Sequence, residues 1–113
     1  MGRGHFPRLR GKLLTIAVIG RFRFPVETVE QARLLMQDVI AATLAEPGCR
    51  AYSYAQDVAE PGLFHVTELW DSRECLSAHF ATPHMQTWQH QRSALGFFDR
   101  DISLFELESE EKI

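Results

Sequence analysis

The order of hydrophobic and polar positions predicts four β-strands. Residues 13–20 are apolar at both alternating sets of positions, which is typical of a strand that is buried on both faces. Residues 49–58 and 63–70 alternate more regularly and are separated by the turn sequence Ala-Glu-Pro-Gly, so they predict an antiparallel hairpin. Residues 100–107 alternate again and form the last predicted strand.

A helical pattern follows the first strand. Pro25 ends the strand, and Thr28 with Gln31 forms a capping box that opens a helix reaching about Leu44. Apolar residues recur there at the spacing of one helix face. These positions are Val29, Ala32, Met36, Val39, Ile40, Thr43 and Leu44. The pattern predicts an amphipathic helix that packs on the sheet.

A second helical region follows Trp70. Asp71 with Glu74 predicts a capping box with the aspartate as the cap. Thr82 then restarts a helix as its N-cap, with Pro83 at the first helical position. Gly96 is the expected end of this region, because glycine commonly terminates helices.

The predicted order βαββαβ defines an α+β, ferredoxin-like fold, in which two helical regions cover one face of an antiparallel sheet. Since the first strand is apolar on both sides, the other face needs a partner, and an identical chain is the simplest one. The prediction is a homodimer with its sheets packed together. We divide the chain into a flexible N-terminal extension (residues 1–12), one folded domain (13–107) and an acidic C-terminal tail (108–113).

Composition narrows the classes of function. The 113 residues are 45% hydrophobic and 24% charged, which is ordinary for one soluble globular domain. No apolar run is long enough to span a bilayer, and no secretory signal is recognisable. Cys49 and Cys75 form no CxxC motif, which favours a reducing compartment. The basic N-terminus lacks an aromatic nucleic-acid motif. We therefore expect a cytoplasmic protein without membrane or nucleic-acid partners.

The block from Trp70 to His84, with the pattern W-D-S-x-E-x-L-x-x-H-x-x-T-P-H, resembles the antibiotic biosynthesis monooxygenase domain family, as do the EPGC run and the βαββαβ order. The resemblance covers roughly residues 13–107 and implies a dimeric α/β-barrel. Members similar to this sequence include cofactor-free oxygenases of quinols and anthrones, and haem-degrading enzymes. Some of them pair the tryptophan with an asparagine. This sequence contains no asparagine, which argues against a haem-degrading activity.

The resemblance implies that a phenolic substrate loses its proton in an apolar pocket and that its anion reacts directly with oxygen. Trp70 and His79 match the tryptophan and helix histidine of the family, and His84 matches a second histidine. On its own pattern, His79 lies on an apolar helix face and is either a general base or a core histidine bonded to backbone. We take His79 and Trp70 as the catalytic candidates.

Six further side chains are candidates for substrate binding, namely Tyr52, Tyr54, Glu68, Phe80, His84 and Trp88. The tyrosines share one strand face and can donate to an oxyanion, or can be ordinary strand residues. Glu68 faces the same side as Trp70, so its carboxylate needs either a raised pKa or a salt bridge to Arg50 or Arg92. His84 can instead cap a helix, and Trp88 can belong to the core.

We expect no cofactor and no metal, because the five histidines form no HxxxH or HExxH pair and no phosphate-binding loop is present. The sequence thus predicts a cofactor-independent monooxygenase that oxidises a quinol-like or polyphenolic aromatic compound with O2. Two alternatives stay open. One is a non-catalytic dimeric protein that binds a small molecule, and the other is an isomerase that uses the same pocket for proton transfer.

Overall fold

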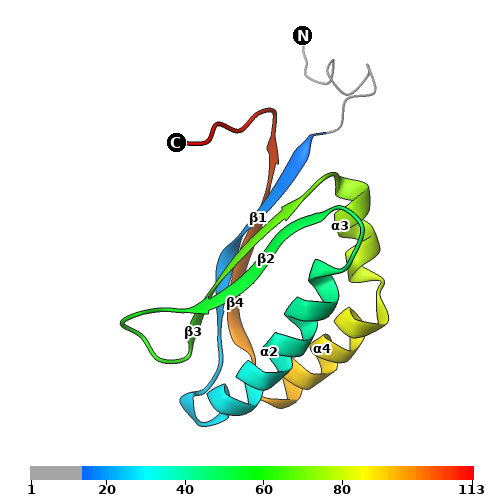
Figure 1. The fold of residues 1–113 in the computed structure, drawn as a ribbon. Coiled ribbons are helices and arrows are strands. Elements are labelled where there is room, and N and C mark those ends of the chain that lie inside the picture. Colours follow the sequence, from blue (N-terminus) through cyan, green and yellow to red (C-terminus); the bar gives the residue numbers. More distant parts are fainter. Residues whose placement is uncertain (1–13) are drawn as a thin grey trace.

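The computed structural model describes residues 14–113 and has the predicted βαββαβ order (Figure 1). The strands are β1 (Thr15–Arg23), β2 (Cys49–Gln56), β3 (Leu63–Trp70) and β4 (Phe98–Leu107). The helices are the short 3-10 turn η1 (Val26–Thr28), α2 (Val29–Leu44), α3 (Arg73–Phe80) and α4 (Pro83–Ala94). All strand pairs are antiparallel, in the sheet order β2-β3-β1-β4. The ferredoxin-like α+β class is confirmed.

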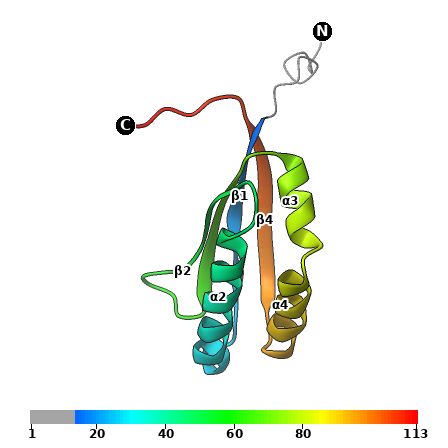
Figure 2. The ribbon, with the colours of Figure 1, turned by 45° about the vertical axis from the view of Figure 1, so that its right-hand side comes forward.

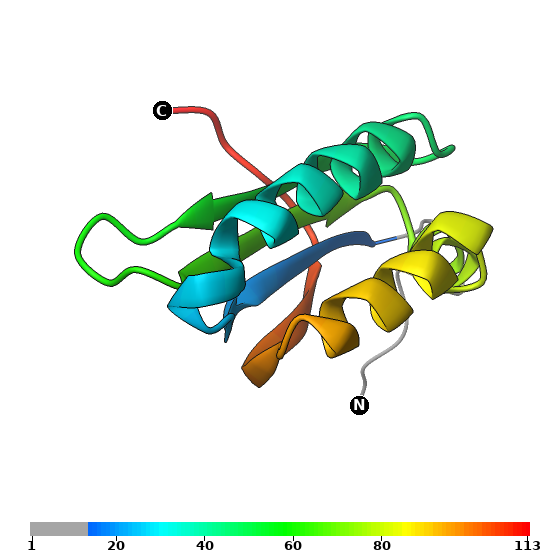
Figure 3. The same cartoon turned by 90° about the horizontal axis from the view of Figure 1, so that it is seen from below.

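The three α-helices lie on one face of the sheet, with α2 and α4 side by side (Figures 2 and 3). The predicted hairpin alternation is correct on β3, where Phe64, Val66, Glu68 and Trp70 are all buried on the helix side. β1 contributes Ile16, opposite Trp70, to the same layer. No helix among residues 14–113 is long and apolar enough to cross a membrane.

At two predicted helix starts, the capping interaction differs from the prediction. Ser72, not Asp71, is the N-cap of α3, because Ser72 has extended backbone and its hydroxyl accepts the Cys75 amide at 3.2 Å. Thr28 precedes α2, but its hydroxyl donates to the carbonyl oxygens of Pro25 and Leu95 instead of capping the helix. The N-cap prediction for α4 is correct, since Thr82 accepts the Met85 amide at 3.3 Å.

Strand bounds shift at several ends. β1 continues through Arg23, three residues past its predicted end, because its pairing with β3 extends to Leu63. β4 begins two residues earlier than predicted, while β2 ends at Gln56 because Asp57 starts the hairpin turn. The predicted extension at residues 1–12 lies outside the described residues. Residues 108–113 are exposed, and Glu110 in this tail pairs with Arg50 at 2.9 Å.

The face of the sheet without helices mixes apolar and polar side chains. Ala17 is buried there between Leu69 and Phe105, whereas Ile19 remains 53% exposed in the single chain. His65 shares this face and bonds Asp57 at 2.8 Å. Within one chain, the first strand is therefore buried only on the side that faces the helices. The homodimer stays a prediction.

Candidate functional site

A small cavity of about 70 Å³ lies between the sheet and the helices α3 and α4. Its walls come from all four strands and both helices. They are Val18, Phe22, Tyr52, Tyr54, Val66, Glu68, His79, Phe80, Met85, Gln89, Arg92, Arg100 and Ile102. The cavity therefore gathers five of the candidates that the sequence predicted, namely Tyr52, Tyr54, Glu68, His79 and Phe80.

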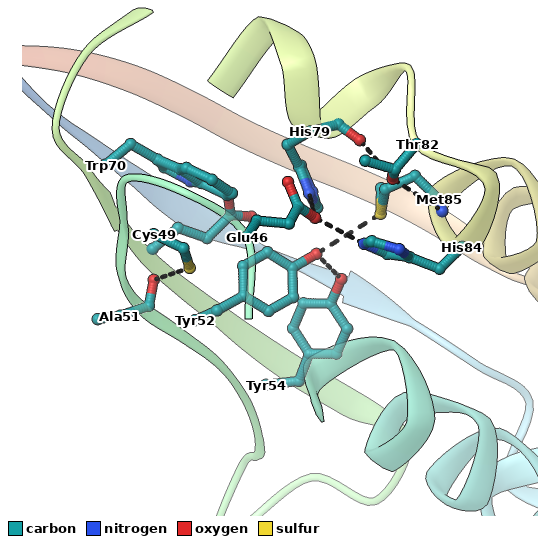
Figure 4. A network of polar contacts seen from close by, with 11 residues as sticks. Glu46, Cys49, Ala51, Tyr52, Tyr54, Trp70, His79, Thr82, His84 and Met85 are labelled. Carbon is teal, nitrogen blue, oxygen red and sulfur yellow. Dashed lines mark hydrogen bonds and ion pairs between the residues drawn. The ribbon is translucent and has the colours of Figure 1, made fainter. Parts of the chain in front are cut away.

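Beside this cavity, Glu46 lies between two histidines (Figure 4). One carboxylate oxygen, Oε2, is 2.8 Å from His79 Nδ1 and 2.6 Å from His84 Nε2. The side chain of His79 is 1% exposed, that of Glu46 10% and that of His84 26%. The two rings thus share one largely buried carboxylate.

Local chemistry explains how Glu46 reaches this position. α2 ends at Leu44, and Glu46 opens the turn that leads into β2. Gly48 in this turn has a φ of +78°, and a Cβ there would stand 2.3 Å from the Cys75 sulfur. Only glycine allows the turn to pass so close to α3. The sequence interpretation treated this stretch only as a turn signal and missed Glu46, because nothing local links it to a histidine 33 residues away.

His79 has the geometry of an oriented imidazole. Burial lowers its pKa, and the hydrogen bond to Glu46 opposes that effect. Within residues 14–113, its Nε2 atom makes no hydrogen bond, and the ring lines the cavity. The predicted alternative, a core histidine bonded to backbone, does not describe it, because its ring partner is a carboxylate. A neutral ring with its proton on Nδ1 would present a basic nitrogen at Nε2.

Glu68 is a second titratable group of the cavity. Its side chain accepts a hydrogen bond from Trp70 Nε1 at 2.9 Å, and burial raises its pKa to about 7. The predicted salt bridge is wrong, because Arg50 pairs with Asp71 and Glu110 instead, and Arg92 stacks on Phe97 at 4.4 Å. The other alternative, a carboxyl whose pKa is raised by burial, fits this environment.

Trp70 is fully buried and lies behind this wall. Its ring centroid is 4.8 Å from that of His79, and its indole N–H holds Glu68. Trp70 does not line the cavity. It can act on a ligand only through the two side chains that it positions.

Tyr52 and Tyr54 form a hydroxyl pair 2.6 Å apart on the covered face of β2. Tyr52 also donates to the Met85 sulfur at 3.9 Å, which leaves Tyr54 to donate to Tyr52 (Figure 4). Burial raises the pKa of both phenols, that of Tyr54 to about 12. Both therefore stay protonated at neutral pH and act as hydrogen-bonding groups.

Two arginines bring positive charge to the cavity. Arg92 from α4 and Arg100 from β4 both line it, and Arg100 partly offsets the raised pKa of Glu68. Neither was a predicted site residue, because an arginine at an exposed-looking position is usually solvated. Their placement supplies cations where a bound anion would lie.

The remaining candidates are spread around this centre. Phe80 is 50% exposed at the edge of the cavity. Trp88 is a core residue stacked on Tyr54. Together with His84 it lines a separate groove of about 200 Å³ between α2 and α4.

Burial raises the pKa of Cys49 to about 11, so its thiol stays protonated at neutral pH.

The donor set of Glu46, His79 and His84 is chemically able to hold a divalent metal ion, and its three ligand atoms lie within 4.8 Å of one another. The sequence, which lacks a spaced histidine pair, predicted no metal. The observed distances are those of hydrogen bonds to a shared oxygen. Glu46, His79 and His84 form the hydrogen-bonded cluster of this site.

Comparison with known proteins identifies the family of this chain. The model of the antibiotic biosynthesis monooxygenase family matches residues 15–91, which is most of the folded chain. The chain belongs to this family. The resemblance drawn from the block between Trp70 and His84 is therefore confirmed.

Individual relatives agree with this assignment. The chain is 33% identical over 76 residues to Rv0793, a proposed monooxygenase of Mycobacterium tuberculosis, covering 67% of this chain and 74% of the relative. The Rv0793 structure superposes with a TM-score of 0.77, at 28% identity over 87% of this chain and 99% of that one. A proposed antibiotic biosynthesis monooxygenase from Deinococcus radiodurans gives a TM-score of 0.81, at 26% identity over 87% and 97% of the two chains.

One further relative is longer than this chain. The Synechocystis protein sll1783, which is uncharacterised, is 28% identical over 92 residues. The match covers 81% of this chain but 63% of the relative.

Proposed function

We propose that the protein is a cofactor-independent monooxygenase that oxidises a quinol-like or polyphenolic aromatic compound with O2. The observation that carries this proposal is the orientation of His79, whose Nδ1 bonds Glu46 while its ring borders the cavity. An imidazole held in this way is suited to take a proton from a phenolic hydroxyl. Membership of the antibiotic biosynthesis monooxygenase family supports the reaction class.

The chemistry follows from the substrate anion. The hydroxyl proton moves to Nε2 of His79, and the electron-rich phenolate then reduces O2. One oxygen atom bonds to a ring carbon, and the other leaves as water with two hydrogens from the substrate. Arg92 and Arg100 line the same cavity and can stabilise the phenolate, and Tyr52 can donate to it in place of its long contact with the Met85 sulfur.

The size of the cavity sets how the substrate enters. A cavity of about 150 Å³ accommodates benzene, so the observed 70 Å³ is too small for a phenolic ring as it stands. A phenolic ring must displace side chains at the exposed edge, where Phe80, Gln89 and Arg100 lie. We expect binding to move these residues while the buried wall of His79 and Glu68 stays in place.

Oxygen consumption tests this function. Purified, metal-stripped protein is assayed with naphthoquinol and with anthrone, and His79→Gln is compared with His90→Gln, a control on the exposed face of α4. The His79 variant should lose about 10²- to 10⁴-fold in rate, the usual contribution of a general base, while the control keeps the wild-type rate. A wild type without uptake on either class, or a fully active His79 variant, would contradict the proposal. Circular dichroism verifies that each variant is folded.

We also propose that two chains pack through the sheet face that carries no helices. Ile19 and Phe105 are 53% and 47% exposed there, and large exposed apolar groups on a sheet face favour a partner. Ile19→Asp should give a monomer in analytical ultracentrifugation, because a carboxylate would be buried without a partner. The matched control is Val58→Asp, which is fully exposed in the hairpin turn. A dimeric Ile19 variant would refute this packing.

A further inference from the structure

We propose that the aromatic substrate carries a carboxylate, which binds to Arg92 and Arg100 at the edge of the cavity while a hydroxyl group faces His79. This inference rests on the proposed function, because it names the substrate class of the same site. The two arginines belong to α4 and β4, and both line the cavity. The proposal is carried by their lack of a carboxylate partner within residues 14–113.

The arginines of residues 14–113 fall into two groups. One group forms ion pairs with carboxylates at N···O distances between 2.7 and 3.8 Å, and it consists of Arg21, Arg23, Arg33, Arg50 and Arg73. The other group is Arg92 and Arg100, whose guanidinium groups make no ion pair and no hydrogen bond to the rest of the described chain. The unpaired guanidinium groups are therefore the two that line the cavity.

The cavity has an excess of positive charge. Among the described residues that line it, Glu68 is the one carboxyl group, so one carboxylate at most faces two guanidinium groups. That carboxyl is held by the indole of Trp70 and makes no ion pair with Arg100. Burial lowers the pKa of Arg92, and the charge of Arg100 acts in the same direction. A bound anion would offset the repulsion between the two cations.

Arg92 is oriented to receive a planar anion. Its guanidinium carbon lies 4.4 Å from the ring centroid of Phe97 and 6.0 Å from that of Trp88. A guanidinium group donates hydrogen bonds in its own plane, so a ring against its face leaves the N–H groups available. A carboxylate can accept two of these hydrogen bonds side by side, which fixes both its position and its plane.

Arg100 and Gln89 place the anion site at the outer edge of the cavity. Both side chains are exposed, whereas the side chain of His79 is 1% exposed at the inner wall. A carboxylate at the edge stays close to water, so it loses less hydration there than it would beside His79. The apolar ring then enters first. This arrangement selects a substrate whose hydroxyl and carboxylate groups lie at opposite ends of the ring system.

Binding without turnover tests the anion site. Isothermal titration calorimetry compares 6-hydroxy-2-naphthoate with 2-naphthol, which is the same ring system without the carboxylate. The wild type should bind the carboxylate about 10- to 100-fold more tightly, the range expected for hydrogen bonds to a charged group. Arg92→Gln and Arg100→Gln should each lose most of this preference, while their affinity for 2-naphthol changes little.

Arg73→Gln is the matched control for the change in charge. It removes one positive charge from an exposed arginine of α3, which pairs with Glu106 outside the cavity, and it should keep the wild-type preference. Equal affinity of the wild type for the two compounds would overturn the proposal, and so would an equal loss of preference in the Arg73 variant. Thermal unfolding verifies the fold of each variant. Arg100→Gln changes an exposed side chain, so the test does not depend on the packing of Arg92.

Oxygen uptake then tests whether the carboxylate belongs to a substrate. Naphthoquinol is compared with 5,8-dihydroxy-2-naphthoate, which is the same quinol with a carboxylate on its second ring. Arg100→Gln should raise KM for the carboxylated quinol by about tenfold with a much smaller change for naphthoquinol, because the lost contact holds the ground state and the transition state alike. Equal changes in KM for the two quinols would contradict recognition of the carboxylate.

The outcomes separate the two proposals. Preferential binding of 6-hydroxy-2-naphthoate by a protein that consumes no oxygen with any quinol would support the anion site and refute the monooxygenase function. Oxygen uptake by a wild type that does not distinguish the carboxylated compounds from the neutral ones would refute the anion site and leave the monooxygenase function intact.

Discussion

The two ends of the interior differ sharply in chemistry. Beneath α2 and α4, Phe22, Phe24, Phe64 and Trp88 pack ring against ring. Around α3 and the start of α4, apolar groups are interrupted by Glu46, Glu68 and the two histidines of the cluster. The first end is a conventional core. The second buries carboxylates that an apolar core would not need.

The two ends therefore contribute differently to stability and to function. Burial of a carboxylate opposes folding, and neither Glu46 nor Glu68 has an arginine or lysine bonded to it within the described residues. A chain selected for stability alone would fill the α3 end with aliphatic side chains. Sites that break the rules of a stable core in this way are commonly functional. Removal of a buried ring at the first end should therefore destabilise the fold, whereas removal of a buried charge at the second end should stabilise it.

The largest effect is expected at the aromatic end. Phe24 is 2% exposed and contacts Phe22, Phe64, Trp88 and Phe97. Phe24→Ala should lower the free energy of unfolding by about 3–5 kcal/mol, because it leaves a cavity in packed rings. Phe80→Ala, at the other end and half exposed, should cost less than about 1 kcal/mol. Urea titration measures both, and equal losses would remove the contrast between the ends.

A smaller effect of opposite sign is expected at Glu68. Its pKa rises from 4.5 to about 7 on folding, so the folded state binds a proton more tightly than the unfolded state. Wild-type stability from this group is therefore present below pH 4.5 and is lost as the pH rises through 7.

Glu68→Gln removes this ionisation and keeps an acceptor for Trp70. At pH 8 the variant should be more stable than the wild type by up to about 3 kcal/mol, and the difference should vanish near pH 4. Thermal or urea unfolding over this pH range gives the curve. Glu74→Gln, at an exposed position of α3, is the matched control and should show no such trend. A stability difference independent of pH would contradict the buried carboxyl.

The smallest effect concerns the helix that carries His79. Ser72→Ala removes the cap of α3 and should cost about 1 kcal/mol, while Asp71→Ala should cost less because Asp71 is not the cap. The ratio of the two losses in chemical denaturation decides which residue caps the helix. A larger loss for Asp71→Ala would reverse the assignment.

Local sequence chemistry predicted much of the fold. Alternation in β3 identified its bounds and its buried face, because a strand that covers one side of a core must repeat every second residue. Thr82 and Pro83 identified the start of α4, because the unpaired backbone N–H groups at the start of a helix need a local acceptor. At Asp71 and Ser72, two adjacent residues can both cap a helix, and only the backbone conformation selects one.

The sequence by itself determined the order of strands and helices, the family, and His79 as the leading candidate base, because each is encoded in contiguous residues. The tertiary structure alone decided that Glu46 joins His79 to His84 and that Glu68 bonds Trp70 instead of an arginine. These contacts join a turn, two helices and a strand that are distant along the chain. Their distances depend on how α3 and α4 settle on the sheet, which no local pattern contains.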